Sequence, residues 1–275
     1  MSSSGTEQAR ELPAQIDTSV AHSARVWNYW LGGKDNFPAD RAAGDAYKEK
    51  YPLIEPFAKE SRDFLRRTVT YLARDAEIRQ FLDVGAGLPT ANNTHEVAQR
   101  IAPESRVVYV DHDPLVLLHV HALLTSTPEG ATAYVEADMR DTEAVITGAA
   151  RTLDLEQPVA LVISDVLGHI VDWDDALSLV RRLVDRLPSG SYLALSHSTA
   201  SDDAHRAVQD EYNASGAIPY IFREPETTIA FFDGLQMVDP GMVSWPNWRP
   251  DTNTGTLTDR AGWGAVARKP CPSRP

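Results

Sequence analysis

An alternation of short β-rich runs with helical segments between residues 80 and 196 is the feature that most constrains the fold. The β-rich runs lie at 80–84, 106–110, 132–137, 159–164 and 191–196, and the intervening helical stretches include 93–101, 114–124 and 173–187. Parallel strands need crossover connections, and these are usually helices that cover both faces of the sheet. The pattern therefore predicts an α/β fold built on a mostly parallel sheet.

Helical periodicity also marks the segment that precedes the sheet. Residues 20–31 carry apolar side chains at helical spacing and end at Gly32 and Gly33, which are a stop signal. A second helix is expected from Asn36, and a third carries an apolar stripe over 57–72. We expect these helices to form a cap or lid on a larger domain.

The segments after the fifth β-rich run predict the rest of the domain. Two helices are expected after Asp202, and the runs 236–244 and 263–268 could pair antiparallel at the sheet edge. The expected organisation is a tail at 1–14, a helical cap at 15–79, the sheet domain at 80–268 and a second tail at 269–275.

Composition and charge narrow the classes of partner. The 275 residues include 26 Lys and Arg against 39 Asp and Glu, a net charge of −13 that disfavours nucleic acid as a partner. The single Cys271 can form no internal disulfide, and His119 and His121 have no companion ligands, so no metal site is expected. Apolar runs such as 159–163 are too short to span a bilayer. We expect a cytoplasmic protein that acts on a small molecule and not on a membrane.

The first strand leads into a glycine turn that suggests a ligand. Gly85, Ala86 and Gly87 follow the strand, and glycines let a ligand approach the backbone, although a purely structural turn would use them too. A dinucleotide loop would continue to a third glycine, but Thr90 stands there, and Asp83 would repel phosphates. The turn thus disfavours NAD and favours a ligand with an ammonium or sulfonium group, such as S-adenosylmethionine.

Acidic residues end the next two strands. Asp111 lies 24 positions after Gly87, the spacing expected for a carboxylate that accepts ribose hydroxyl protons, and His112 follows it. Asp138 could accept a proton from an adenine amino group, and Met139 could pack on the ring. Because ligands of such sheets gather at the carboxyl ends of the strands, these residues are candidates for one site.

Together with Ser164 and Asp165, these motifs resemble the class I S-adenosylmethionine-dependent methyltransferases over residues 80–268. The segments 22–37, 87–96, 232–235 and 239–241 are similar to a bacterial methyltransferase family of mostly unassigned function. The resemblance implies a Rossmann-like, seven-stranded sheet with its last strand antiparallel, and S-adenosylhomocysteine as product. It also implies cofactor contacts at Asp83, Gly85, Gly87, Asp111 and Asp138.

The residues after the fourth strand indicate which kind of molecule could accept the methyl group. Enzymes of this class that methylate base amino groups carry Asp or Asn, two prolines and an aromatic residue there, whereas this chain has Asp165-Val166-Leu167-Gly168. Methylation of bases is therefore disfavoured. Asp165 is the leading candidate for an acceptor-side and cofactor-contacting residue, and His169 and His197 are candidates for a general base, although each histidine could be structural.

The first helix carries aromatic side chains around nearly its full circumference, among them Trp27, Tyr29 and Trp30. They could be ordinary core, or they could form a lid whose rings exclude water and contact the sulfonium. Arg25 or Lys34 could pair with the methionine carboxylate of the cofactor, or could be solvated charges.

The sequence leaves three functions open. The favoured one is methyl transfer from S-adenosylmethionine to a small molecule. A protein that senses S-adenosylmethionine without turning it over is the second, since no strong catalytic dyad is visible, and a nicotinamide-dependent oxidoreductase is the least favoured.

Overall fold

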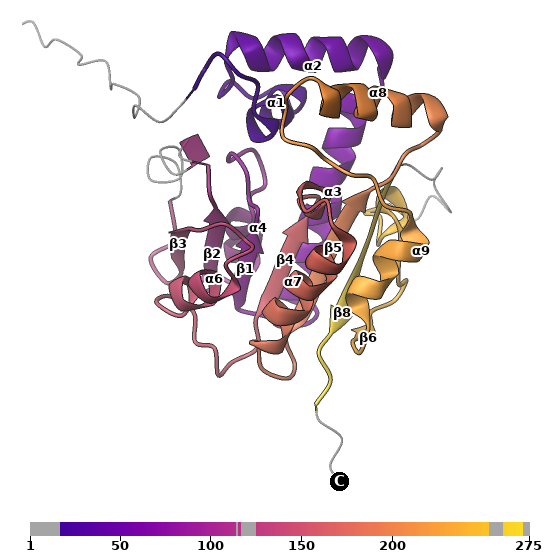
Figure 1. The fold of residues 1–275 in the computed structure, drawn as a ribbon. Helices are drawn as coiled ribbons and strands as arrows, with labels where there is room; N and C mark the ends of the chain where they lie inside the picture. Colours follow the sequence, from indigo (N-terminus) through magenta and orange to yellow (C-terminus); the bar gives the residue numbers. More distant parts are fainter. Residues whose placement is uncertain (1–16, 114, 117–124, 253–260, 272–275) are drawn as a thin grey trace, which may run out of the picture.

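The computed structural model describes residues 17–113, 115–116, 125–252 and 261–271, and they build one mixed sheet flanked by helices (Figure 1). The strands are β1 (Gln80–Val84), β2 (Arg106–Asp111), β3 (Ala131–Glu136), β4 (Ala160–Ser164), β5 (Tyr192–Ser198), β6 (Gln236–Met237), β7 (Val243–Ser244) and β8 (Gly262–Arg268). Their order is β3-β2-β1-β4-β5-β8-β6, and β7 also pairs with β8. The five predicted β-rich runs are all strands.

Strand directions follow the expected pattern. The strands β1 to β5 pair in parallel, with Asp83 opposite Tyr109 on β2, and β8 is antiparallel to β5. The expected edge run 236–244 is divided into β6 and β7, which both pair with β8, so the described sheet counts eight strands. Between them Pro240 offers no N–H for a ladder, and Gly241 turns the chain at φ 84°.

The helices cover both faces of the sheet. They are α1 (Ser23–Trp30), α2 (Pro38–Lys50), α3 (Ile54–Arg74), α4 (Thr94–Ile101), α6 (Thr142–Ala149), α7 (Trp173–Asp185), α8 (Asp203–Ala214) and α9 (Pro225–Thr228). The second helix begins at Pro38 and not at Asn36, because proline suits a first helical position, where no N–H is needed. The predicted helix 114–124, with His119 and His121, lies almost wholly outside the described residues.

Alternate side chains of the strands enter two hydrophobic layers. Leu82 and Val84 face the layer that holds α6 and α7, whereas Phe81 faces α3 and α4. The predicted stripe of α3 is buried along its length, including Phe64 and Leu72. The third helix therefore packs directly on the sheet.

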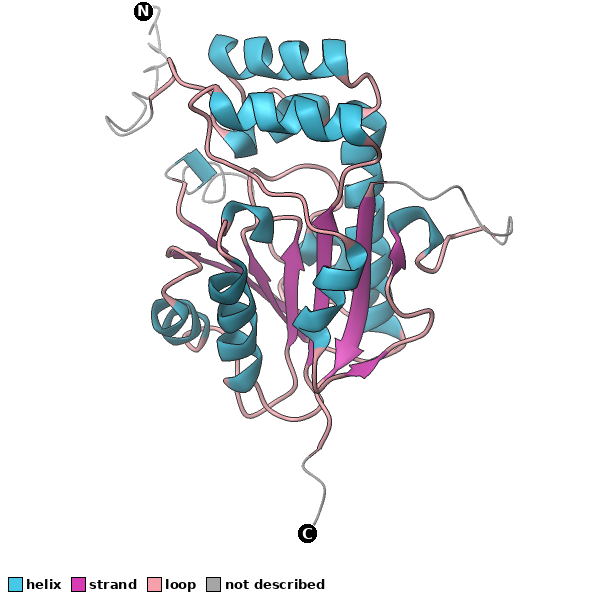
Figure 2. Ribbon diagram, turned by 45° about the vertical axis from the view of Figure 1, so that its right-hand side comes forward, coloured by secondary structure: helices cyan, strands magenta, loops and turns pink. Residues whose placement is uncertain are grey.

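Three helices lie beyond the carboxyl ends of the parallel strands, where the arrowheads point (Figure 2). They are α1, α2 and α8, with α1 and α8 both in contact with α2. This arrangement leaves the strand-end loops facing a helical layer across a cavity. Among the described residues, no helix is long and apolar enough to cross a membrane.

Candidate functional site

A cavity of about 390 Å³ lies between the strand ends and helices α1, α2, α3 and α8. Its volume falls within the range of small-molecule sites, roughly 300–1,000 Å³. The predicted site residues that line it are Asp83, Gly85, Ala86, Gly87, Asp111, His112, Asp138, Met139, Asp165 and His169. The sheet brings them together because their loops all follow carboxyl ends of neighbouring parallel strands.

The two glycines of the first turn face different surroundings. Both have positive φ, 74° at Gly85 and 64° at Gly87. A Cβ at Gly85 would lie 2.5 Å from a methyl of Val166, whereas a Cβ at Gly87 would have no atom within 4 Å. Packing therefore excludes a side chain at Gly85, and at Gly87 a side chain would occupy open space at the cavity.

Asp111 joins the first turn to the end of β2. Its Oδ2 accepts a hydrogen bond from Gly87 N at 2.8 Å, and its Oδ1 accepts from the backbone of His112 at 2.8 Å and Asp113 at 3.1 Å. A carboxylate has about four lone-pair sites, so one remains for a ligand hydroxyl. Asp113 instead serves the chain locally by accepting from Leu115 N.

The buried carboxylate of Asp83 and the partly buried guanidinium of Arg62 both belong to the lining. Asp83 Oδ2 accepts from Thr94 Oγ1 at 2.6 Å. Burial raises the pKa of Asp83 to about 6, while Thr94 and then the charge of Arg62 oppose that rise. Arg62 Nη2 donates to the carbonyls of Ala91 and Asn92, at 3.4 Å in both cases.

Sequence reasoning missed Arg62. Its Nε is buried without a hydrogen-bond partner among the described residues, as is Thr90 Oγ1, and both residues line the cavity. Such atoms fit a site that a polar ligand completes. The helical periodicity could have identified it. Arg62 lies four residues after Ala58 and three before Leu65, which are both buried, so it belongs to the inward side of the helix.

The third strand end supplies a partly exposed acid and a buried thioether. Asp138 Oδ2 pairs with Arg140 Nη1 at 2.9 Å, and its Oδ1 accepts from Arg140 N. Met139 is buried and also lines the cavity.

Asp165 sits at the end of β4 in a strained conformation, with φ 53° for a residue that has a side chain. Its Oδ1 accepts from Tyr220 Oη at 2.5 Å and Ser198 Oγ at 2.7 Å. Burial raises the pKa of Asp165 to about 6. Sequence reasoning missed both donors, because Tyr220 lies 55 positions from Asp165 on a segment without a motif.

The two candidate histidines differ in whether they face the cavity. His169 lines the cavity, with Nδ1 2.8 Å from the carbonyl of Pro219. His197 does not line it: Nδ1 lies 2.8 Å from Ser198 O, and Nε2 lies 2.9 Å from Arg223 Nη1. Burial lowers the pKa of His197 to about 3. Both of its ring nitrogens are engaged within the protein.

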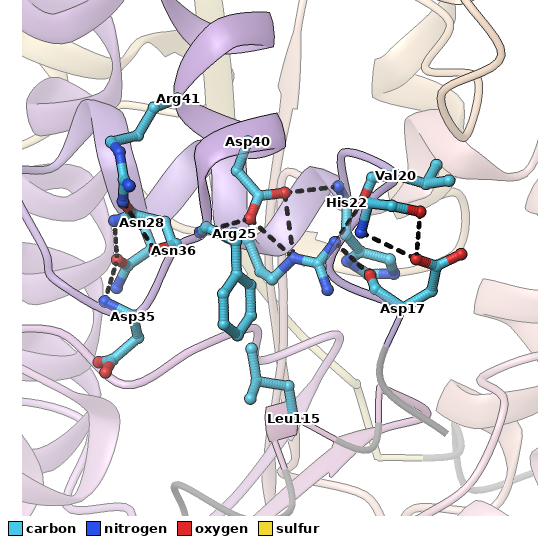
Figure 3. Close-up of polar contacts among 12 residues, drawn as sticks. Asp17, Val20, His22, Arg25, Asn28, Asp35, Asn36, Asp40, Arg41 and Leu115 are labelled. Atoms are coloured by element: carbon cyan, nitrogen blue, oxygen red, sulfur yellow. Dashed lines mark hydrogen bonds and ion pairs between the residues drawn. The ribbon is translucent and has the colours of Figure 1, made fainter. Parts of the chain in front are cut away.

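Three further candidates lie outside the lining of the cavity. Arg25 Nε is 3.0 Å from Asp40 Oδ1, and its Nη2 donates to the carbonyls of Asp17 and Val20 (Figure 3). Tyr29 Oη donates to Asp45, and Lys34 is exposed. Arg25 forms an ion pair with Asp40 because Asp40 is fully buried and a buried carboxylate needs a charged partner.

The described residues contain no group of three or more His, Cys, Asp or Glu side chains suited to hold a metal ion.

The chain is similar to known proteins over most of its length. A family model described as S-adenosyl methyltransferase matches residues 9–270. A DUF574 family protein from Streptomyces avermitilis is 48% identical, with a TM-score of 0.88 over 93% of this chain and 100% of that chain. A candidate methyltransferase from Thermobifida fusca is 36% identical, with a TM-score of 0.86 over 94% and 98%. No curated protein matches the chain.

The chain belongs to the S-adenosyl methyltransferase family, and it is an S-adenosylmethionine-dependent methyltransferase. A magnesium protoporphyrin IX methyltransferase from Synechocystis, crystallised with S-adenosylhomocysteine, shares the fold alone. Its TM-score is 0.51 at 12% identity, over 89% of this chain and 92% of that chain.

Proposed function

We propose that the cavity holds S-adenosylmethionine along the strand ends and that the enzyme methylates a small molecule on the Asp165 side. The opposite charges of Asp83 and Arg62 carry this proposal. The buried Asp83 carboxylate and the partly buried Arg62 guanidinium match the ammonium and carboxylate of the cofactor's amino-acid part. A dinucleotide has no ammonium and carboxylate on one carbon, and Asp83 would repel its phosphates.

The remaining strand ends account for the rest of the cofactor. The free lone pair of Asp111 would accept a proton from a ribose hydroxyl, next to the backbone of Gly85, Ala86 and Gly87 and the side chain of His112. Asp138 and Met139 would hold the adenine by a hydrogen bond and by packing. We do not assign a cofactor contact to Arg25, Tyr29 or Lys34.

Bound S-adenosylmethionine supplies a methyl group that the positive charge on its sulfur makes electrophilic. The chain's own residues hold the acceptor and take its proton. Tyr220 and Ser198 engage Oδ1 of Asp165, which leaves Oδ2 to accept a proton, and a pKa near 6 leaves the carboxylate ionised at neutral pH. His169 can contact the acceptor from the lining, while His197 would act as a positioning residue through Ser198 and Arg223.

A small molecule is favoured over a nucleic acid as the acceptor. The chain carries a net charge of −13, and four aspartates line the cavity: Asp83, Asp111, Asp138 and Asp165. This field repels polyanions.

The test compares two ligands that differ in the amino-acid part. Calorimetry would measure S-adenosylhomocysteine and 5′-methylthioadenosine, which lacks the ammonium and carboxylate, on the wild type and on Arg62→Met. Losing a charge-assisted hydrogen bond costs about 1.5–3 kcal/mol, so S-adenosylhomocysteine should bind roughly ten- to a hundredfold more weakly to the variant. Methylthioadenosine should bind both proteins equally.

Arg186→Met is the matched control, because Arg186 forms an exposed pair with Glu143 outside the cavity lining. Equal weakening of both ligands by Arg62→Met would show a general loss of structure and remove the assignment. No binding of S-adenosylhomocysteine to the wild type would remove the proposed cofactor site itself.

A further inference from the structure

Aromatic rings form a continuous wall on the helical side of the cavity. Ring centroids lie 5.1 Å apart between Trp30 and Tyr47, 6.3 Å between Tyr47 and His205, 4.8 Å between His205 and Phe222, and 6.0 Å between Phe222 and Tyr220. All five line the cavity, and we call them the ring wall. They come from α1, α2, α8 and the segment that follows α8, so only the tertiary fold assembles them.

The ring wall ends at Asp165, the residue proposed to accept the proton. Tyr220, its last member, donates its hydroxyl hydrogen to Asp165 at 2.5 Å. Trp30, Tyr47 and His205 are buried and support the wall from behind, so a molecule in the cavity would meet mainly Phe222 and Tyr220, with a carboxylate beside them. Phe222 and Tyr220 remain partly exposed, which leaves ring surface for a ligand to cover.

The ring wall itself carries no charge at neutral pH. Tyr47 Oη donates to Gln209 Oε1 at 3.0 Å and lies 3.2 Å from His205 Nε2. Burial raises the pKa of Tyr47 and of Tyr220 and lowers that of His205 to about 4, so the phenols stay protonated and the imidazole stays neutral. In contrast to the Asp83 and Arg62 end, the five rings themselves offer no cation to an acidic ligand.

We propose that the ring wall binds the methyl acceptor, and that the acceptor is an uncharged planar ring compound that carries a hydroxyl group. This inference rests on the proposed function. Flat rings stack on aromatic side chains at a gain of about 0.5–1.5 kcal/mol per pair beyond burial. Asp165 would repel a carboxylate, and a protonated amine would pair with Asp165 but have no free lone pair to attack a methyl group.

The proposed methyl transfer needs only the acceptor, the cofactor and Asp165. The acceptor oxygen forms a bond to the methyl carbon as the bond from that carbon to sulfur breaks, and the sulfur keeps the electron pair. The hydroxyl proton passes to Asp165. The products are a methyl ether and S-adenosylhomocysteine.

Three naphthalene probes that share a ring system and differ in the charge of the substituent test the acceptor class. They are 2-naphthol, 2-naphthoate and 2-(aminomethyl)naphthalene, measured by calorimetry at pH 7.5 on the full chain with S-adenosylhomocysteine bound. We expect 2-naphthol to bind at least about tenfold more tightly than 2-naphthoate, and to be methylated when S-adenosylmethionine replaces S-adenosylhomocysteine, whereas the protonated amine pairs with Asp165 and is not methylated. Binding of 2-naphthoate as tight as that of 2-naphthol, or methylation of the amine and not of 2-naphthol, would overturn the proposal.

Variants locate the probe on the ring wall. Phe222→Leu removes one partly exposed ring and should weaken 2-naphthol binding roughly three- to tenfold, while S-adenosylhomocysteine binding changes less than about twofold. Tyr71→Leu is the matched control, since Tyr71 contacts Trp248 and Arg249 and does not line the cavity. If Phe222→Leu fails to fold by circular dichroism, Tyr212→Leu replaces it, because Tyr212 also lines the cavity.

The outcomes separate the two proposals. If S-adenosylhomocysteine binds and 2-naphthol binding is the same in Phe222→Leu and the wild type, only the acceptor site is wrong. If S-adenosylhomocysteine itself does not bind, the proposed function is wrong.

Discussion

Two carboxylates of one cavity, the buried Asp83 and the partly buried Asp165, have the same direction of pKa shift and different partners. Burial raises the pKa of both Asp83 and Asp165 to about 6. Asp83 has a hydroxyl donor and the nearby charge of Arg62, whereas Asp165 has two hydroxyl donors, Tyr220 and Ser198. The surroundings of Asp83 are suited to binding a zwitterion, and those of Asp165 are suited to accepting a proton.

At the residue scale, we predict that Asp165 titrates near pH 6. Its carboxyl is protonated below that pH and ionised above it, so proton acceptance is available at neutral pH and is lost as the pH falls through 6. Tyr220→Phe removes a hydrogen bond that favours the ionised form, which should move the midpoint to higher pH. Nuclear magnetic resonance of ¹³C-labelled aspartate carboxyls measures both values.

Two variants assign the resonances of this titration. Asp165→Asn should remove one of the signals with a midpoint near 6, and Asp83→Asn should remove another. A midpoint for Asp165 near that of an exposed aspartate, about 3.9, would contradict the prediction.

At the element scale, α1 joins several neighbours through its rings. Trp27 contacts Phe57 of α3 edge to face at 6.2 Å, and Trp30 Nε1 donates to Gly44 O of α2. Trp27 and Trp30 also line the cavity, whereas Tyr29 reaches outward to α2. The wide aromatic circumference of this helix thus serves core packing and cavity lining at once.

A buried ion pair adds to the contacts that attach α1 to α2. Asp40 is fully buried and accepts from Arg25 Nε as well as from the backbone of His22 and Phe37. We predict that Arg25→Met lowers the free energy of unfolding by about 3–5 kcal/mol, because it leaves a buried carboxylate without its cation. Urea unfolding followed by circular dichroism measures this difference.

Lys48→Met is the control, because it breaks the more exposed pair with Glu55, which joins α2 to α3. Exposed pairs contribute about 0–1 kcal/mol. The prediction fails if Arg25→Met costs no more than Lys48→Met.

At the scale of the whole molecule, the helical layer lies over the strand ends (Figure 2) and forms one side of the cavity. We predict that amide hydrogen exchange in residues 25–36 slows when S-adenosylhomocysteine binds, because a ligand ties down a segment that opens more readily than the core. Mass spectrometry of peptides from both states measures the change, with α7 on the distant face as internal reference. Equal exchange with and without ligand in 25–36 would show that this segment is permanent core.

Local patterns determined much of the sheet and part of the site. The strands from Gln80 to Ser198 were readable because apolar runs and helical periodicity report burial directly. The placement of Gly87, Asp111 and Asp138 around one cavity followed from a general property of parallel sheets, whose carboxyl ends meet at one edge. These inferences need only neighbours in sequence and the topology of the sheet.

Only the tertiary structure decided which charged and polar groups meet. Arg25 and Arg62 are both basic residues on cap helices, but packing places the first against Asp40 and leaves the second facing the cavity. Tyr220 reaches Asp165 from another segment of the chain. The physical reason is that a hydrogen bond or ion pair depends on distances of about 3 Å, which are set by packing between elements remote in sequence.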